Sequence, residues 1–209
     1  GYETDTYGLA FGGDFKVGRS TYGLSFSYAD TDVDSKGAGN AQTDISSYQA
    51  TFYTDYTTDK WYVEGLVGYA RNEIDTSRSI SLTSLTATAG YGSNQFMINI
   101  GGGMPIEVAK NHFITPNASF QYTLVDNETY TETGAGALNL RVDQDEVNIA
   151  LGVFGARYHT HNEMKSGTLT PEIRGSLTYD FAGDDGQSTS LANGGGAAFG
   201  VTGADVVEL

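Results

Sequence analysis

The sequence contains no cysteine, which excludes disulfide scaffolds, zinc ribbons, iron–sulfur clusters and thiol nucleophiles. Only 3 of its 209 residues are proline, too few for a collagen-like or proline-rich disordered chain. Cations are also scarce, because 11 Lys and Arg face 26 Asp and Glu, and a net charge of −15 makes nucleic acid an unsuitable partner. No run of apolar residues is longer than three, whereas a membrane-spanning helix needs about 20.

The sequence is instead rich in glycine and in segments where apolar and polar residues alternate. It contains 28 glycines, roughly twice the share expected from an average of about 7%. Eight segments alternate apolar and small polar residues with the period of a β-strand. They span 4–17, 21–31, 44–56, 61–70, 86–106, 113–125, 146–158 and 168–181. A ninth is expected to begin in 199–209, and the whole length suits one β-barrel domain.

The apolar face of each strand can be read from the alternation. The first strand carries Tyr7, Leu9, Phe11 and Phe15 on one face. In the seventh strand the same reading selects Val147, Ile149, Leu151 and Val153 as the apolar face. The sequence therefore predicts an all-β, antiparallel up-and-down transmembrane barrel.

The connections between strands alternate in length. Short connections are expected near 18–20, 57–60 and 107–112, an intermediate one near 159–167, and long ones near 31–43, 71–85, 126–140 and 182–198. Outer-membrane barrels show this asymmetry, with short periplasmic turns and long external loops. We therefore expect the long connections to lie outside the cell.

Aromatic residues are expected to form two belts on the apolar face, at the two membrane interfaces. The two belts are six to eight residues apart along each strand. At about 3.3 Å per residue along tilted strands, this separates them by roughly 15–20 Å, close to the height of a lipid-facing band. The predicted upper belt, on the side of the long connections, is Tyr7, Tyr28, Tyr48 and Tyr69. The lower belt, on the side of the short turns, is Phe15, Tyr22, Tyr56 and Trp61.

The opposite face separates a membrane barrel from a water-soluble, lipocalin-like one. A soluble barrel should carry many Lys, Glu and Arg there, but this face is mostly Gly, Ser, Thr, Ala, Asn and Gln. Small polar residues favour a confined aqueous lumen, and the soluble ligand-binding barrel is the weaker alternative.

Seven stretches, taken in order, resemble the β-domain of type V secretion autotransporters. They are GYETDTYGLAFGGDFKVG, FSYADTDVDSKG, DISSYQATFYTDY, WYVEGLVGYARNEIDTSR, FITPNASFQYT, GAGALNLRVD and LTPEIRGSLTYDF. The resemblance implies a twelve-stranded outer-membrane pore, threaded by a helix that joins it to an N-terminal passenger exported to the surface. It also implies that 1–209 form one such domain, incomplete at both ends, since strands two to nine and the start of strand ten are present.

The resemblance gives the polar residues a role, which is to keep the pore hydrated and to seat the helix by polar contacts. The expected partners are outer-membrane lipid, the passenger with its pore helix, and the barrel assembly machinery. The expected lumen-facing residues are Asp14, Lys16, Asp55, Glu64, Gln95, Asn99, Asn117, Gln121, Glu172 and Arg174.

No enzymatic or metal site is predicted, and no cofactor is expected. The sequence has no G-x-S-x-G elbow, and its three histidines all lie at predicted lower turns. His159 and His161 form an H-x-H pair without an evident third ligand for zinc. Asp30, Asp32 and Asp34 resemble the start of a calcium loop, but that loop needs Gly and Glu where Ser35 and Ala41 stand.

The function predicted from the sequence is therefore the translocator pore of an autotransporter. A small outer-membrane barrel that displays its loops as an adhesin or antigen is the first alternative. An outer-membrane enzyme is the second, and it would require a serine and a histidine close together at the barrel rim.

Overall fold

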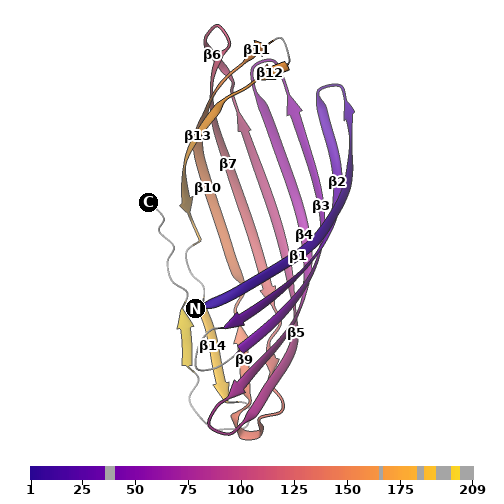
Figure 1. Ribbon diagram of the computed structural model, residues 1–209, viewed down its shortest axis with the longest axis vertical. Helices are drawn as coiled ribbons and strands as arrows, with labels where there is room; N and C mark the ends of the chain where they lie inside the picture. The colour runs from indigo at the N-terminus through magenta and orange to yellow at the C-terminus, as the bar shows by residue number, and fades with distance from the viewer. Residues whose placement is uncertain (36–40, 165–166, 183–185, 192–198, 203–209) are drawn as a thin grey trace.

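A computed structural model of the chain describes every residue except 36–40, 165–166, 183–185, 192–198 and 203–209, with side chains described up to residue 182. The described part is built almost wholly from β-strands (Figure 1). It contains a single helix, the 3-10 turn η1 (Gly136–Leu138), and none with the length and apolar character of a membrane span.

One antiparallel sheet dominates the structure, and its strands follow one another in sequence order. Each of the eight predicted segments contributes one long strand to it. These strands are β1 (Tyr2–Val17), β2 (Ser20–Ser35), β3 (Ala41–Thr57), β4 (Tyr62–Ile80), β5 (Leu85–Gly103), β7 (His112–Asn127), β10 (Val147–Thr160) and β13 (Glu172–Asp180). The short strand β6 (Ile106–Ala109) pairs with β7.

The sheet is open, because β1 and β13 stand at its two ends and no ladder joins them in the described chain. Two smaller sheets accompany it. At the end with short turns, the top of Figure 1, β11 (Asn162–Met164) pairs with β12 (Gly167–Leu169). At the opposite end, β8 (Tyr130–Thr131), β9 (Leu140–Gln144), β14 (Gly186–Leu191) and β15 (Phe199–Thr202) form a four-stranded sheet.

The strand register sorts the side chains of the main sheet onto two faces. Phe11 pairs with Phe26, and Leu24 pairs with Phe52, so large apolar residues share one face, here called the aromatic face. On the other face, here called the small-polar face, Gly12 is paired with Ser25 and Ser25 with Thr51. This two-sided order follows from the period of two in each strand.

Two of the long connections expected from the sequence, 71–85 and 31–43, are mostly strand. β4 continues to Ile80 and β5 begins at Leu85, so the predicted connection 71–85 reduces to the turn 81–84. β2 likewise runs to Ser35 and β3 starts at Ala41. The prediction was wrong because apolar alternation was taken as the mark of a strand, whereas a strand outside lipid can be polar on both faces and still complete its ladder.

The predicted apolar face of the seventh strand is also wrong. Phe154 of β10 pairs with Ala118, next to Phe120 on the aromatic face, and with Leu177 of β13. The aliphatic residues of β10 therefore point to the small-polar face. These are Val147, Ile149, Leu151 and Val153. The error arose because an apolar set was assumed to mark the same face in every strand, although Phe154 belongs to the opposite set.

Two prolines break predicted strands. The segment 86–106 ends as β5 at Gly103, and Met104 and Pro105 separate it from β6. The segment 168–181 is divided by Thr170 and Pro171 into β12 and β13. Proline lacks the backbone donor that a ladder needs, so both breaks are expected where proline stands. The predicted ninth strand is described only over Phe199–Thr202, and it pairs with β14 rather than with β13.

Side chains are buried mainly at the end of the sheet opposite the short turns. In the described chain the buried apolar side chains are Ala70, Ile74, Ala87, Ala135 and Val142. The first three lie on the small-polar face of β4 and β5, and the other two lie in the segment 128–144 that folds against them. The sheet itself has no conventional core, because its aromatic face is largely exposed.

Candidate functional site

The ten polar residues predicted to face a lumen all lie on the small-polar face. Asp14 pairs with Gly23, Asp55 with Glu64, and Asn99 with Gln121, which carries this face across from β1 to β7. Tyr53 donates a hydrogen bond of 3.2 Å to Asp14 across β2. Glu172 and Arg174 continue the face on β13, and Lys16, Gln95 and Asn117 share it.

The eight predicted belt residues all lie on the aromatic face in two rows, and six of them make ring contacts within their row. The ring centroids of Tyr28 and Tyr48 are 5.1 Å apart in the upper row. In the lower row, Phe15 lies 5.7 Å from Tyr22, and Tyr56 lies 5.5 Å from Trp61. Trp61 immediately precedes β4, and Tyr7 and Tyr69 complete the upper row.

The aromatic face between the rows is apolar and exposed. Phe11 is 64% exposed, Phe120 is 43% exposed and Leu177 is 79% exposed, so the exposure extends across the whole sheet. A soluble protein rarely exposes an apolar patch beyond a few hundred Å². A face this large and this apolar requires a hydrocarbon environment or another apolar surface.

A cluster of charged side chains occupies the small-polar face of β10 and β13 near the short turns. Glu172 Oε1 lies 2.5 Å from Arg174 Nη2 in an ion pair, and Arg157 Nη1 lies 3.8 Å from Oε2 of the same carboxylate. Two guanidinium groups thus share one carboxylate, which leaves an excess positive charge. His159 stacks on Phe113 with centroids 5.0 Å apart and lies within β10 rather than in the turn predicted from the sequence.

A buried ion pair fixes the segment 128–144 at the end of the sheet opposite the short turns. Arg78 donates from Nε to Glu132 Oε1 at 3.0 Å and from Nη2 to Glu132 Oε2 at 2.5 Å. The same carboxylate accepts the Leu140 N–H at 2.8 Å, and Arg78 also reaches the Leu138 carbonyl at 3.1 Å. The side chain of Glu132 is only 6% exposed, so the predicted connection 126–140 is an ordered cap rather than an open loop.

Tyr130 lies beside this ion pair and is stacked on Tyr91 with centroids 4.4 Å apart. Burial, with a smaller repulsion from Tyr91 and Glu132, raises the pKa of Tyr130 to about 12. The phenol is therefore held in its neutral form when the cap is closed.

This pKa predicts that the cap weakens at high pH. In the opened cap Tyr130 loses its proton near its ordinary pKa of about 10, whereas in the closed cap it keeps the proton until about 12. The stability of the closed cap is thus complete below about pH 10 and falls as pH rises to about 12. Hydrogen exchange of 128–144, measured relative to the base-catalysed rate of free amides at each pH, should accelerate over that interval. The acceleration should be absent in Tyr130→Phe, and an identical pH response in both proteins would refute the assignment.

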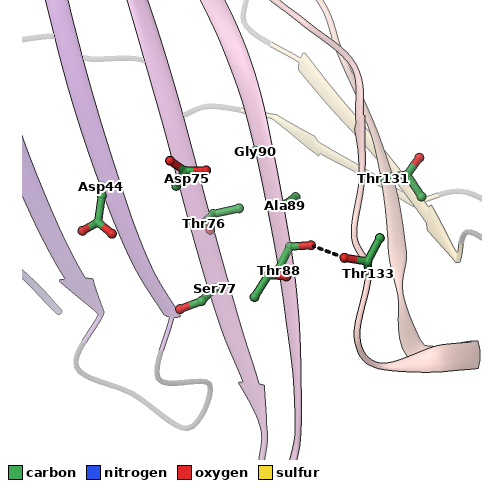
Figure 2. A pocket seen from close by; sticks show the side chains of 9 residues that line it. All are labelled: Asp44, Asp75, Thr76, Ser77, Thr88, Ala89, Gly90, Thr131 and Thr133. Atoms are coloured by element: carbon green, nitrogen blue, oxygen red, sulfur yellow. Dashed lines mark hydrogen bonds between the residues drawn. The ribbon is translucent and has the colours of Figure 1, made fainter.

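A cavity of about 430 Å³ lies on the aromatic face beyond the upper belt (Figure 2). Asp44 and Asp75 are paired across β3 and β4, and the row continues to Asp32 and Asp5 on β2 and β1. Strand β5 and the segment after β7 meet at the edge of the cavity. The Thr88 N–H donates to the Thr133 carbonyl at 2.9 Å, and the Thr133 hydroxyl donates to the Thr88 carbonyl at 3.4 Å, the bond drawn in Figure 2. The lining residues are Asp44, Asp75, Thr76, Ser77, Thr88, Ala89, Gly90, Thr131 and Thr133.

The cavity offers carboxylates and hydroxyls, but neither a histidine nor a lysine lines it to act as a base. Across the described part of the chain, no three His, Asp or Glu side chains come together as metal ligands. Asp30, which began the calcium-like pattern, accepts hydrogen bonds from Tyr28 at 2.9 Å and Ser46 at 3.0 Å.

Sequence reasoning missed Arg157, Arg78 and Glu132. Arg157 was overlooked because β10 was read in the wrong phase, and the correct phase places it directly opposite Arg174. Arg78 and Glu132 are 54 residues apart in a segment that was read as loop, and no local pattern marks their contact.

Comparisons with known proteins agree with this geometry. The family described as "Autotransporter beta-domain" matches residues 1–208. Outer membrane protein A of Rickettsia conorii (strain ATCC VR-613 / Malish 7) is 28% identical over 194 residues, which cover 87% of this chain and 10% of that protein. The chain thus spans about a tenth of the length of this curated relative.

Two solved structures share the fold. The translocator domain of the autotransporter NalP from Neisseria meningitidis superposes with a TM-score of 0.73 at 16% identity, covering 97% of this chain and 76% of that one. The β-domain of the Bordetella autotransporter BrkA gives a TM-score of 0.65 at 17% identity, covering 92% of this chain and 80% of that one. With the family matching nearly every residue, this chain belongs to the autotransporter β-domain family.

Proposed function

We propose that this chain forms the greater part of an outer-membrane pore that exports a passenger, part of the same polypeptide, to the cell surface. The observation that carries the proposal is the two-faced sheet. One face exposes aromatic and aliphatic side chains across all its long strands, and the other is small and polar. Lipid on the first face and water on the second satisfy both.

The belts and the polar residues take their roles from this arrangement. The two aromatic rows would lie at the membrane interfaces, where amphipathic rings are favoured. The residues from Asp14 to Arg174 on the small-polar face would line the pore and contact the transiting chain. Insertion would need the barrel assembly machinery, because a sheet of this kind is built in the membrane rather than in water.

The two open edges bear on how the pore closes. Unpaired backbone groups on β1 and β13 would each cost several kcal/mol in lipid. The matched translocator structures extend beyond the aligned region, since this chain covers 76% and 80% of them. We therefore propose that further strands complete the barrel between β13 and β1.

The feature that favours the adhesin alternative is the ordered cap formed by 128–144, which would give the barrel an ordered surface to display. It predicts no exported passenger. The soluble barrel alternative is disfavoured by the exposed aromatic face, which would aggregate in water.

The test uses the longer polypeptide that contains this chain, expressed on cells, with an epitope placed ahead of residue 1. We expect an antibody to bind that epitope on intact cells. In the same cells, Leu82→Cys should react with a membrane-impermeant thiol reagent, because Leu82 is 97% exposed in the turn between β4 and β5. Asp59→Cys, in the turn between β3 and β4, should react only after the outer membrane is opened.

Each of the two measurements has a result that would contradict the proposal. An epitope that stays hidden while Leu82→Cys reacts would favour a surface barrel without export. Reaction at Asp59→Cys but not at Leu82→Cys would invert the topology.

A further inference from the structure

The aromatic face carries a groove near the end of the sheet with the short turns. Two hollows of about 410 Å³ and 460 Å³ form the groove, and they adjoin because Val63 and Ile100 line both. Each hollow has the size of a small-molecule site. The residues on the floor are small, and they are Thr54 and Gly65 in the first hollow and Gly102 and Ala118 in the second.

The groove interrupts a face that is otherwise bulky. Two residues farther from the short turns, Leu24, Phe52 and Val67 stand side by side with no small residue between them. At Gly65, by contrast, a Cβ would meet no atom closer than 3.9 Å. The aromatic rings that border this space are those of Tyr22, Tyr56, Phe120 and Phe154. A flexible apolar chain can fill such a hollow.

The groove reaches the lower aromatic belt. Tyr22 and Tyr56 of that belt line the first hollow, together with Ser20 at the start of β2. The ring of Tyr56 also contacts Trp61, with 5.5 Å between centroids. Aromatic belts mark the level of the lipid headgroups. An apolar chain in the groove would therefore place its polar end beside the short turns.

Two cations flank that end of the groove, in the turns 18–19 and 58–61, here called the lower rim. Arg19 lies in the first turn and Lys60 in the second, and both are exposed. The first turn is tied to β3, because the Thr57 N–H donates to the Arg19 carbonyl at 3.0 Å. Arg19 also lies 3.4 Å from Asp59, in an ion pair whose side chains are 54% and 90% exposed. Such an exposed pair contributes little, so Arg19 can turn to another anion.

The opposite end of the aromatic face has the other sign of charge. Beyond the upper belt it carries a row of four carboxylates, Asp5, Asp32, Asp44 and Asp75. At the lower rim, Arg19 and Lys60 outnumber Asp59. An anionic headgroup is thus attracted to the lower rim and repelled from the far end of the same face.

A lipid suits the groove better than a second copy of the chain. Two copies related by a twofold axis along the membrane normal present the same surface to each other at the same height. The lower rim of one copy would then face the like charges of the other, and these repel. A phospholipid brings a phosphate to the rim and a flexible chain to the hollow, so it complements both parts.

We propose that the groove binds one anionic phospholipid, with an acyl chain over Gly65 and Gly102 and the phosphate between Arg19 and Lys60. The inference rests on the proposed function only in taking the aromatic face as lipid-facing. It adds the leaflet, the strands that hold the lipid and the charge of its headgroup.

Trp61 provides the measurement, because it is the only tryptophan in the sequence and its ring contacts the groove residue Tyr56. The longer polypeptide, with any other tryptophan changed to phenylalanine, is reconstituted in phosphatidylcholine vesicles. These contain either brominated phosphatidylglycerol or brominated phosphatidylcholine at the same mole fraction, and bromine quenches a nearby tryptophan. We expect the anionic lipid to quench with an apparent affinity at least about fivefold higher. Equal quenching by the two lipids would overturn the proposal.

A second arm tests the cations. Changing both, as Arg19→Gln with Lys60→Gln, should reduce the preference for phosphatidylglycerol to less than about twofold, whereas Arg19→Lys should keep it because the charge remains. Lys110→Gln removes a cation from the turn between β6 and β7, outside the groove, and should change nothing. A preference that survives the loss of both cations would reject the phosphate site.

A third arm fills the groove. Gly65→Leu adds a side chain where there is space for it, and the preference should fall at least about threefold because the acyl chain is displaced. Gly13→Leu is the matched control, since Gly13 lies on the aromatic face of β1 outside the groove and a Cβ there would meet no atom within 4 Å. Equal effects of the two variants would show that the lipid does not lie in the groove.

Assembly and export are measured separately. Heat-modifiable migration on a denaturing gel identifies the variants whose barrel is assembled, and only those are compared. An exposed epitope on cells together with equal quenching by the two lipids would reject the lipid site and leave the export function standing. A Trp61 that neither lipid quenches would reject the membrane placement, and a hidden epitope would reject the export function.

Discussion

Replacing Phe26 by arginine should abolish assembly of the barrel. Phe26 lies on the aromatic face between the two belts, it is 43% exposed, and its ring stacks on Phe11 with centroids 5.8 Å apart. An arginine facing lipid near the midplane costs about 2–4 kcal/mol, which lowers the equilibrium constant for folding by roughly 30-fold to 1000-fold and reduces the folded fraction accordingly. Heat-modifiable migration of the protein from outer-membrane fractions measures that fraction.

Ser25→Arg is the matched control, one residue earlier in the same strand. Ser25 points to the small-polar face between Gly12 and Thr51, where an arginine side chain can extend into water. We expect assembly close to that of the unmodified protein. The opposite ranking of the two variants would show that β2 has been read in the wrong phase and that its two faces are exchanged.

The second large effect is expected at Arg78. Removing its side chain in Arg78→Ala leaves Glu132, 6% exposed, with the Leu140 N–H as its hydrogen-bond donor. Breaking a buried pair in this way costs about 3–5 kcal/mol, and partial exposure of Arg78 places the cost near the lower bound. The opening of the cap should therefore become about 100-fold more frequent, seen as faster hydrogen exchange in 128–144.

Arg141→Ala provides the comparison, because Arg141 forms an ion pair in the same segment at the surface. It lies 3.2 Å from Asp143, and both side chains are more than half exposed. Such pairs contribute about 1 kcal/mol or less, so exchange should change by at most about fivefold. Equal effects of the two variants, or loss of the whole barrel in Arg78→Ala, would show that the ion pair does not act locally on the cap.

The architecture could be predicted from sequence wherever lipid imposes a pattern. Within the expected membrane region each strand alternates, and the positions of Tyr28, Tyr48 and Trp61 follow from that alternation alone. Beyond the upper belt both faces meet water, so the pattern disappears although the ladder of β4 and β5 continues. Hydrogen bonding, which holds those extensions together, leaves little trace in the order of side chains.

The polar wall was harder to predict than the apolar one. A single aromatic residue, Phe154, fixes the phase of β10, while four aliphatic residues argue for the opposite phase. Only the register against β7 and β13 decides between the two. The ion pair of Arg78 and Glu132 is a tertiary contact between distant segments, and sequence periodicity carries no information about it.

If the chain exports a passenger as proposed, the strand extensions set the point at which the passenger leaves the barrel. From Tyr69 to Ile80, β4 extends about 36 Å along its own axis. At a tilt near 40°, this places Ile80 roughly 28 Å beyond the upper belt along the barrel axis. β7 ends at Asn127, and the segment 128–144 continues the wall beside β5, where Thr88 pairs with Thr133. An extended passenger needs about eight residues to clear that height. In the proposed pore those residues would form a tether, and the first folded unit of the passenger would be held at that distance from the lipid surface.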